Sequence, residues 1–178
     1  MKPFVLSLMI PACMFFCSGK SQELETVSSV DLEKYLGLWY EIASFPTRFQ
    51  KGCRCSTAEY QSVPNREHLL VINKCLKIKP GGSKLTVKKA KAFPVKGYNN
   101  ARLKVQFFWP FKGDYYIIEL ADDYSFVVVG HPERNYLWFL SREPYMTTDT
   151  YAMLVERIKS KGYDITRLQK SMQNCEDK

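Results

Sequence analysis

The sequence predicts an all-β protein: an eight-stranded up-and-down antiparallel barrel with one C-terminal α-helix packed on its outside. β-Branched and aromatic segments recur along the chain with short turn sequences between them, and helical spacing of apolar residues appears only after the last of them. A chain of 178 residues suits one well-packed domain and is short for two. Eight consecutive short strands favour a closed barrel, because closure removes the sheet edges and encloses room for one small ligand.

The expected strands are separated by sequences such as Val63-Pro64-Asn65-Arg66 and Pro80-Gly81-Gly82-Ser83, whose residue types favour chain reversal. They cover residues 39–45, 55–61, 69–76, 84–93, 102–108, 114–121, 126–130 and 136–142. The helix follows, capped by Thr148 or Asp149 and stopping near Gly162. Its apolar residues recur at helical period and predict a face that packs on the barrel: Ala152, Leu154, Val155 and Ile158.

The N-terminus has the features of an export signal. Lys2 precedes an almost uncharged apolar run over residues 4–16, which is too short to span a bilayer as a mature helix. We expect residues 1–17 to be the signal, residues 18–29 a polar tether and residues 30–178 the folded domain. Cys17-Ser18-Gly19 fits two alternatives, an acylated lipoprotein cysteine or a small-residue cleavage site. Phe15 and Phe16 depart from the usual small-residue lipobox, and Cys13 is a weaker acylation candidate.

The formal net charge of +8 becomes +7 when residues 1–17 are removed, because the signal contributes only Lys2, so the basic character belongs to the mature domain. The densest basic stretch, residues 84–91, alternates lysines with Val87 and Ala90 as a solvated strand would. We expect no nucleic-acid partner, since no RNP-like aromatic motif and no zinc-finger spacing is present in the sequence. A weak attraction to anionic lipid surfaces is compatible with this basic face.

Two segments about a hundred residues apart carry the most information. Gly37-Leu38-Trp39-Tyr40-Glu41-Ile42 reads as a tight approach to an apolar strand, and Tyr136-Leu137-Trp138-Phe139-Leu140-Ser141-Arg142 as a strand that ends in a cation, so a stack of Arg142 on Trp39 is chemically natural. With Arg48-Phe49, Val71-Ile72-Asn73-Lys74 and Phe107-Phe108-x-Pro110-Phe111 between them, the chain resembles the lipocalin family. Within that family it is most similar to the bacterial outer-membrane lipocalins and the apolipoprotein D-like proteins.

The resemblance implies a binding, storage or transport protein whose barrel holds a fatty acid or a lysophospholipid. It assigns Gly37, Trp39 and Arg142 to the scaffold that closes one end. If Arg142 reaches inward, the period of two along a strand turns Trp138 inward as well. The resemblance places Tyr60 and Asn73 in the pocket, and Phe49 and Phe107 are plausible residues of its mouth. The expected ligand-binding set is therefore Trp138, Tyr60, Asn73, Phe49 and Phe107.

Four cysteines remain once the signal is removed, an even number that suggests two disulfides in an exported chain. By analogy with the barrel-to-tail bridge of the apolipoprotein D-like proteins we expect Cys55–Cys175, which leaves Cys53–Cys75. The alternation of side chains along a strand conflicts with the second pair. If Cys75 points inward and Cys53 outward with Cys55, the bridge requires a bulge.

No catalytic motif is evident. His68 and His131 lie in or beside turns, and the sequence contains no phosphate-binding loop, nucleophile elbow or paired Cys-x-x-Cys set. We expect a non-enzyme without cofactor or metal; the alternative is a lipocalin-type isomerase that uses a pocket thiol, Cys75. The expected location is exported, as an outer-membrane lipoprotein held by a lipid anchor on Cys17 or in the periplasm, otherwise secreted. A homodimer is left open.

Overall fold

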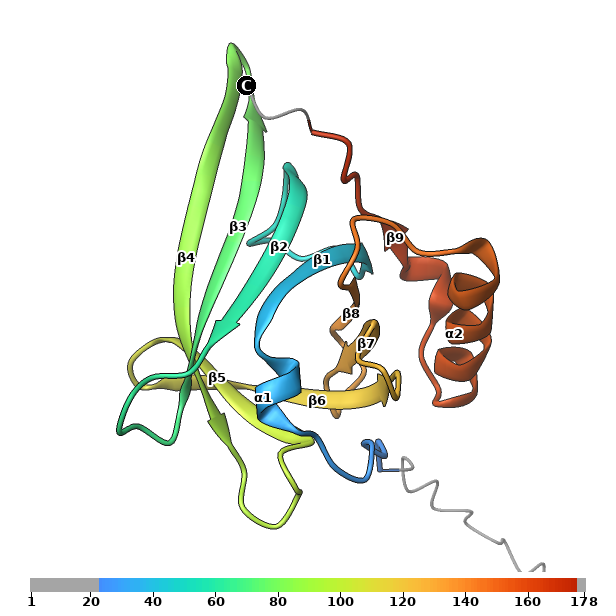
Figure 1. Ribbon diagram of the computed structural model, residues 1–178. Helices are drawn as coiled ribbons and strands as arrows, with labels where there is room; N and C mark the ends of the chain where they lie inside the picture. The colour runs from blue at the N-terminus through green and yellow to red at the C-terminus, as the bar shows by residue number, and fades with distance from the viewer. Residues whose placement is uncertain (1–22, 176–178) are drawn as a thin grey trace, which may run out of the picture.

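The computed structural model describes residues 23–175, which form a closed antiparallel barrel with a helix outside it (Figure 1). The expected export signal and Cys17 lie outside the described residues. A short helix, α1 (Leu32–Tyr35), precedes the barrel. The barrel strands are β1 (Gly37–Ser44), β2 (Cys53–Gln61), β3 (Leu69–Lys79), β4 (Gly82–Pro94), β5 (Arg102–Phe108), β6 (Phe111–Leu120), β7 (Phe126–Gly130) and β8 (Leu137–Ser141). They are followed by α2 (Thr148–Ser160), the 3-10 helix η1 (Ile165–Arg167) and β9 (Gln169–Lys170).

The barrel closes because β1 pairs with both β8 and β2, while every other barrel strand pairs with its neighbours in sequence. All eight expected strands are present. The β3–β4 hairpin is longer than expected, since its ladder continues to Lys79 opposite Gly82, and it extends far from α1 (Figure 1). Up-and-down connectivity places the β1–β2, β3–β4, β5–β6 and β7–β8 connections at one end, which we call the mouth. The other connections and α1 lie at the opposite end, the base.

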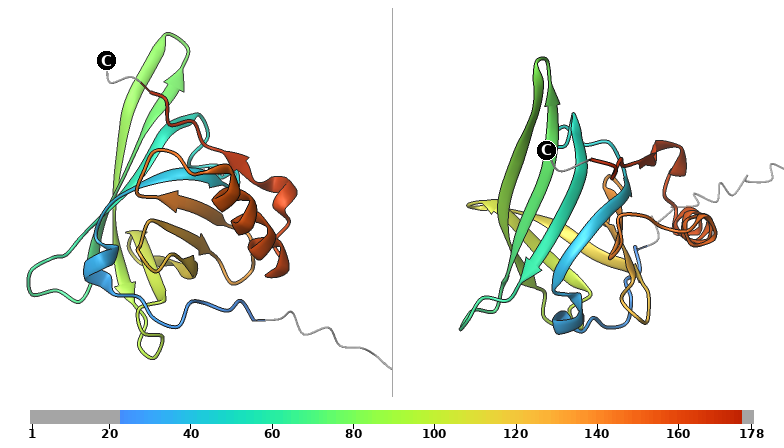
Figure 2. Two further views of the ribbon diagram at one scale, coloured as in Figure 1. Left: turned by 45° about the vertical axis from the view of Figure 1, so that its right-hand side comes forward. Right: turned by 45° about the horizontal axis from the view of Figure 1, so that its top comes forward.

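Two buried clusters hold the fold together. One lies inside the barrel and includes Trp39, Leu103 and Val127. The second lies between the outer face of the barrel and α2, whose Leu154 and Ile158 are fully buried against it. Figure 2 shows α2 on the outside of the barrel in both views. Burial of one apolar face explains why a helix of this composition forms at this point in the chain.

The boundaries of α2 correct one detail of the sequence interpretation. Its N-cap is Thr147, whose hydroxyl accepts a hydrogen bond from the backbone N–H of Thr150, rather than Thr148 or Asp149. All three residues have side chains suited to capping, so sequence alone does not separate them. The helix ends at Ser160, shortly before Gly162, which has a φ of +84°. Within residues 23–175 no helix is long and apolar enough to cross a membrane.

The base is closed by a compact set of interactions around Trp39. Its indole Nε1 donates to the carbonyl of Tyr35 at 2.9 Å, and the guanidinium of Arg142 lies 3.7 Å from its ring centroid. Arg142 also donates to the carbonyls of Leu38 and Lys34, at 2.8 and 2.7 Å. Gly37 has a φ of +93°, and a Cβ at this position would lie 3.4 Å from Arg142 Nη1. Glycine is therefore suited to this tight approach.

The described N-terminal segment is not a free tether. Leu24 is 1 % exposed in the outer cluster, and Val30 is buried in the inner one. The backbone N–H of Val27 donates to the carbonyl of Ile117, and Glu23 forms an ion pair of 2.8 Å with Arg102. The tether expected over residues 18–29 is thus wrong from residue 23 onward. Three apolar side chains dock this segment near the base, and the folded unit begins before Val30.

The C-terminal segment fills the seam where β1 and β2 diverge towards the mouth. β9 pairs with the end of β1, Ser171 N–H donates to the carbonyl of Ile42, and Cys55 N–H donates to the carbonyl of Met172. The Gln173 side-chain amide bridges the two strands by donating to the carbonyls of Glu41 and Ser56. A disulfide between Cys55 and Cys175 fastens this segment.

A second disulfide joins Cys53 to Cys75. The parity problem is resolved by a register shift between Arg54 and Thr57, where Cys55 adopts a φ of +50°. The bulge changes the phase of β2, so that Cys53 reaches Cys75 while Cys55 reaches the C-terminal segment.

Candidate ligand-binding site

The inner face of the barrel changes character from base to mouth. Buried apolar side chains occupy the part nearer the base, among them Val127 and Leu140, which pair across β7 and β8. The paired strands β3 and β4 continue this face towards the mouth. Because alternate residues share a face, the inward phase set by the buried pair Val71 and Ala90 runs through three further cross-strand pairs: Asn73 with Lys88, Cys75 with Thr86, and Lys77 with Lys84.

This register divides the lysine-rich stretch of β4 between two faces. Lys88 follows the phase of the buried Ala90 and Ala92, whereas Lys89 and Lys91 follow the opposite phase. All four lysines of the stretch, Lys84, Lys88, Lys89 and Lys91, are exposed as the sequence predicts, but they are divided between two faces of the strand. At the mouth, three lysines share the inner phase: Lys77, Lys84 and Lys88.

Deeper in the barrel, three tyrosine hydroxyls form a short chain. Tyr115 lies between Tyr35 and Tyr60, with oxygen–oxygen distances of 2.7 Å to each. Burial raises the pKa of Tyr60 to about 12 and raises the pKa values of Tyr35 and Tyr115 well above 10.0. All three are consequently neutral at physiological pH. Two bonds use two of the three hydroxyl hydrogens, so one hydrogen remains available to a water or a polar ligand atom.

Trp138 lies on the inner face at the start of β8, stacked on Tyr136 with ring centroids 5.8 Å apart and an interplanar angle of 7°. Its Nε1 donates to Gln50 Oε1 at 3.1 Å, and Gln50 Nε2 donates to Glu41 Oε2 at 2.6 Å. The indole is therefore oriented by a residue of the β1–β2 loop, and this loop is fastened to β1.

Glu41 is a buried carboxylate that receives hydrogen bonds from three elements. Besides Gln50, the hydroxyls of Ser44 and Ser171 donate to it, the latter at 2.5 Å. These donors offset the cost of burying the carboxylate. They also couple the orientation of Trp138 to the C-terminal segment, because Ser171 follows β9.

The remaining predicted residues occupy different depths. Tyr60 is buried in the hydroxyl chain, whereas Asn73 is half-buried and, among the described residues, has no side-chain hydrogen-bond partner. Phe49 and Phe107 are exposed at the mouth, and the ring of Phe49 lies 6.4 Å from that of Tyr136. Tyr136 therefore lies between Phe49 and Trp138 and contacts both rings. Among the described residues, Phe107 has no ring contact with any of these three side chains.

Sequence reasoning missed Gln50, Glu41 and Tyr115 as members of this region. Glu41 was accessible in principle, since it lies two residues after Trp39 and therefore shares its inward phase. Tyr115 lies in a predicted strand, but its two hydroxyl partners come from α1 and β2. No local pattern indicates such a contact.

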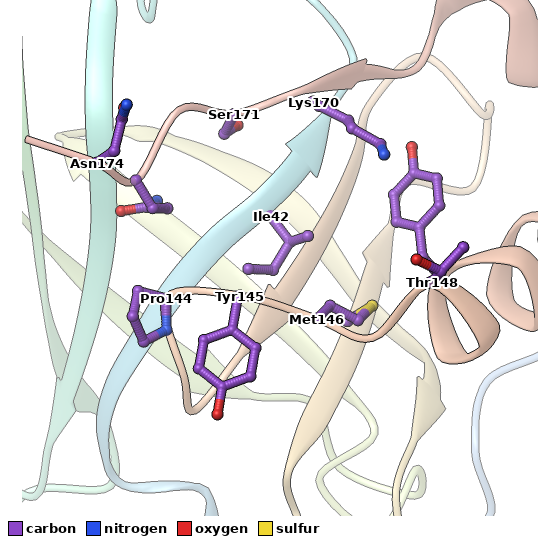
Figure 3. A pocket seen from close by; sticks show the side chains of 10 residues that line it. Ile42, Pro144, Tyr145, Met146, Thr148, Lys170, Ser171 and Asn174 are labelled. Atoms are coloured by element: carbon purple, nitrogen blue, oxygen red, sulfur yellow. The ribbon is translucent and has the colours of Figure 1, made fainter.

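Two surface pockets adjoin the C-terminal segment. One, of about 580 Å³, lies between the β1–β2 loop and β9 and includes Glu41 and Gln50 in its wall. The other, of about 410 Å³, lies outside the barrel (Figure 3). Its floor is Ile42, whose side chain belongs to the outer cluster, and its sides are residues 144–148 and the segment around Ser171. Neither pocket contains Tyr60 or Trp138.

The isomerase alternative loses its proposed nucleophile, because Cys75 is bonded to Cys53 and is not a thiol. His68 packs beside Phe93, with ring centroids 5.3 Å apart, and His131 beside Tyr136 at 5.5 Å. Within residues 23–175 no group of three or more His, Cys, Asp or Glu side chains is arranged to hold a metal ion.

A closed barrel with an apolar inner face and a polar mouth defines a class of small-ligand-binding proteins. Comparison with known proteins agrees with this class. The family model described as a Lipocalin-like domain matches residues 30–173, so the chain belongs to the lipocalin family.

Similar proteins occur in distant organisms. The chain is 37 % identical to the outer membrane lipoprotein Blc of Vibrio cholerae over 153 residues, covering 85 % of this chain and 88 % of Blc. It is 34 % identical to apolipoprotein D of Mus musculus over 174 residues, covering 91 % and 87 %. The solved structure of insecticyanin from Manduca sexta has the same fold, with a TM-score of 0.66, 16 % identity and 84 % of each chain covered.

Proposed function

We propose that this lipocalin binds and carries a small hydrophobic ligand with an anionic head group, a fatty acid or a lysophospholipid, on the inner face of its barrel. The observation that carries the proposal is the gradient along β3 and β4. Apolar Val71 and Ala90 are followed towards the mouth by Asn73 with Lys88 and by Lys77 with Lys84. An acyl chain directed to the base places its acidic head group among these lysines.

The physical basis of binding is burial. Each methylene transferred from water to an apolar environment contributes about 0.8 kcal/mol. The lysines add charge-assisted hydrogen bonds to a carboxylate or phosphate. Similarity to Blc and apolipoprotein D supports ligand binding in general. No chemical step is part of this function.

The test uses two adjacent lysines of opposite phase. Lys88→Glu places a negative charge on the inner face, and we expect it to weaken binding of a long-chain fatty acid about tenfold or more while leaving a neutral monoacylglycerol unaffected. Lys89→Glu has the same charge change on the outer face and is the matched control. Titration of a fluorescent fatty acid measures both variants. Equal weakening by the two substitutions would contradict the assigned head-group position.

The ligand carried in cells is identified by a separate experiment. Organic extraction of the purified protein followed by mass spectrometry should recover a fatty acid or a lysophospholipid. Recovery of a neutral lipid, or of none, would count against the proposed class.

We further propose that the chain is exported and held by a lipid anchor on Cys17, an outer-membrane or periplasmic location that the similarity to the Blc lipoproteins supports. Cys17→Ser should move the protein to the soluble fraction; a wild-type protein that is already soluble and lacks acyl groups is a secreted carrier instead.

A further inference from the structure

The turn between β5 and β6 exposes an unusual amount of aromatic surface. Trp109 is 86 % exposed, and Phe108 and Phe111 are each 68 % exposed. The two phenylalanines are paired across the turn, with ring centroids 5.8 Å apart. The turn projects from the barrel (Figure 2). Contiguous exposed aromatic groups of this kind mark contact surfaces, because soluble monomers seldom leave them in water.

Cations are concentrated at the same end of the barrel, where the β7–β8 connection also carries Glu133 beside Arg134. The β1–β2 connection and the β3–β4 hairpin lie at the same end as the β5–β6 turn. Residues 44–54 and 77–88 contain no acidic side chain. Their basic residues are Arg48, Lys51, Arg54, Lys77, Lys79, Lys84 and Lys88, and Lys112 follows the aromatic turn.

We infer that the mouth docks on an anionic lipid bilayer, with the Trp109 turn in the interfacial region and the cations of this end over the head groups. Tryptophan prefers the membrane–water interface, and basic side chains are attracted to anionic leaflets. The charge pattern favours lipid over a second copy of this chain. A symmetric dimer through the mouth sets the same cations against each other.

Docking by the mouth brings the inner face to the lipid from which a ligand leaves or to which it returns. The docking surface shares Lys77, Lys84 and Lys88 with the proposed ligand site, so the test changes only Trp109, Phe111, Lys51 and Lys79, which are not among the residues assigned to ligand binding. The inference therefore goes beyond ligand binding, and either proposal can fail alone.

The test uses the mature chain, residues 18–178 without acylation, which contains every described residue. Binding is measured by co-sedimentation with phosphatidylcholine vesicles, with and without phosphatidylglycerol, and by tryptophan emission. We expect binding and a blue shift only with phosphatidylglycerol, and release of the protein at about 0.5 M salt.

Two sets of variants locate the contact. Trp109→Ser with Phe111→Ser should remove the blue shift and lower the partition coefficient at least about tenfold. Lys51→Glu and Lys79→Glu should each lower it about fivefold or more. Tyr145→Ser is the control, because Tyr145 is 66 % exposed in the connection after β8, at the base. Fatty-acid affinity in solution should be unchanged in all of them.

Three results would overturn the inference. They are equal binding to both kinds of vesicle, an effect of Tyr145→Ser as large as that of the aromatic pair, and no binding at all. A monomer–dimer equilibrium in sedimentation that Trp109→Ser abolishes would assign the surface to a second copy instead.

Discussion

Trp39 at the base and Trp138 at the mouth are both inward-facing indoles on neighbouring strands, but their surroundings differ. Trp39 is 0 % exposed, donates to a backbone carbonyl and lies under the guanidinium of Arg142. Trp138 is half-buried and donates to the side chain of Gln50, a loop residue. The base fixes its tryptophan through a backbone carbonyl and a stacked guanidinium, whereas the mouth holds its tryptophan through the side chain of a loop residue.

The largest expected effect tests the base. Trp39→Ala removes the residue that the inner cluster and Arg142 surround, and should lower the free energy of unfolding by about 3–5 kcal/mol. Trp138→Ala is the matched substitution at the mouth and should lower it by much less, since its site is already partly open to solvent. Urea denaturation followed by circular dichroism measures both. Similar losses of unfolding free energy in the two variants would show that the two tryptophans contribute equally to stability, which would contradict the proposed difference between base and mouth.

The next effect concerns the seam at the mouth. Cys55→Ser combined with Cys175→Ser removes a bridge between residues 120 apart in sequence and should lower the free energy of unfolding by about 2–4 kcal/mol. The amide of Ser171, bonded to the carbonyl of Ile42, should lose hydrogen-exchange protection first. Amides of β1 near Trp39 should keep theirs. Uniform loss of protection would mean that the bridge stabilises the whole barrel.

The strands and the outer helix were predictable because alternation and helical spacing are local properties of the chain. The N-terminal segment was misjudged for the opposite reason. Leu24, Val27 and Val30 are isolated apolar residues in a polar stretch, and only the barrel surface explains their burial. The predicted N-cap of α2 was also wrong. Thr147 caps the helix instead of Thr148 or Asp149, and all three side chains are equally suited to this position.

The candidate site was only partly accessible to sequence reasoning. Parity along β8 predicts that Trp138 faces inward when Arg142 does, and the structure places it there. Parity along β4 also separates Lys88 from Lys89, but only once Ala90 is known to be buried. Gln50 lies in a loop, where no periodicity applies, so its bond to Trp138 required the structure.

A pH titration tests the buried hydroxyl chain of Tyr35, Tyr60 and Tyr115. Burial raises the pKa of Tyr60 to about 12, above the ordinary value of 10.0. Its neutral form therefore contributes stability that is fully present below pH 10 and is lost as the pH rises towards 12. The loss amounts to about 3 kcal/mol at most. Tyr60→Phe should reduce the slope of unfolding free energy against pH in this window, and an unchanged slope would contradict a buried, neutral Tyr60.

The most direct test of the mouth is the affinity of the Trp138→Ala variant for a ligand. This is also the smallest expected effect, because the substitution should leave the fold intact. The indole lies on the inner face at the mouth end of β8, so its loss should weaken fatty-acid binding about tenfold while the far-ultraviolet circular dichroism spectrum stays unchanged. Gln50→Ala separates contact from orientation: it keeps the indole but removes its hydrogen-bond acceptor, and should weaken binding less. Isothermal titration of both variants with one fatty acid gives the comparison. An unchanged affinity in Trp138→Ala would remove this residue from the site, and a larger effect of Gln50→Ala would indicate that the β1–β2 loop, rather than the indole, contacts the ligand.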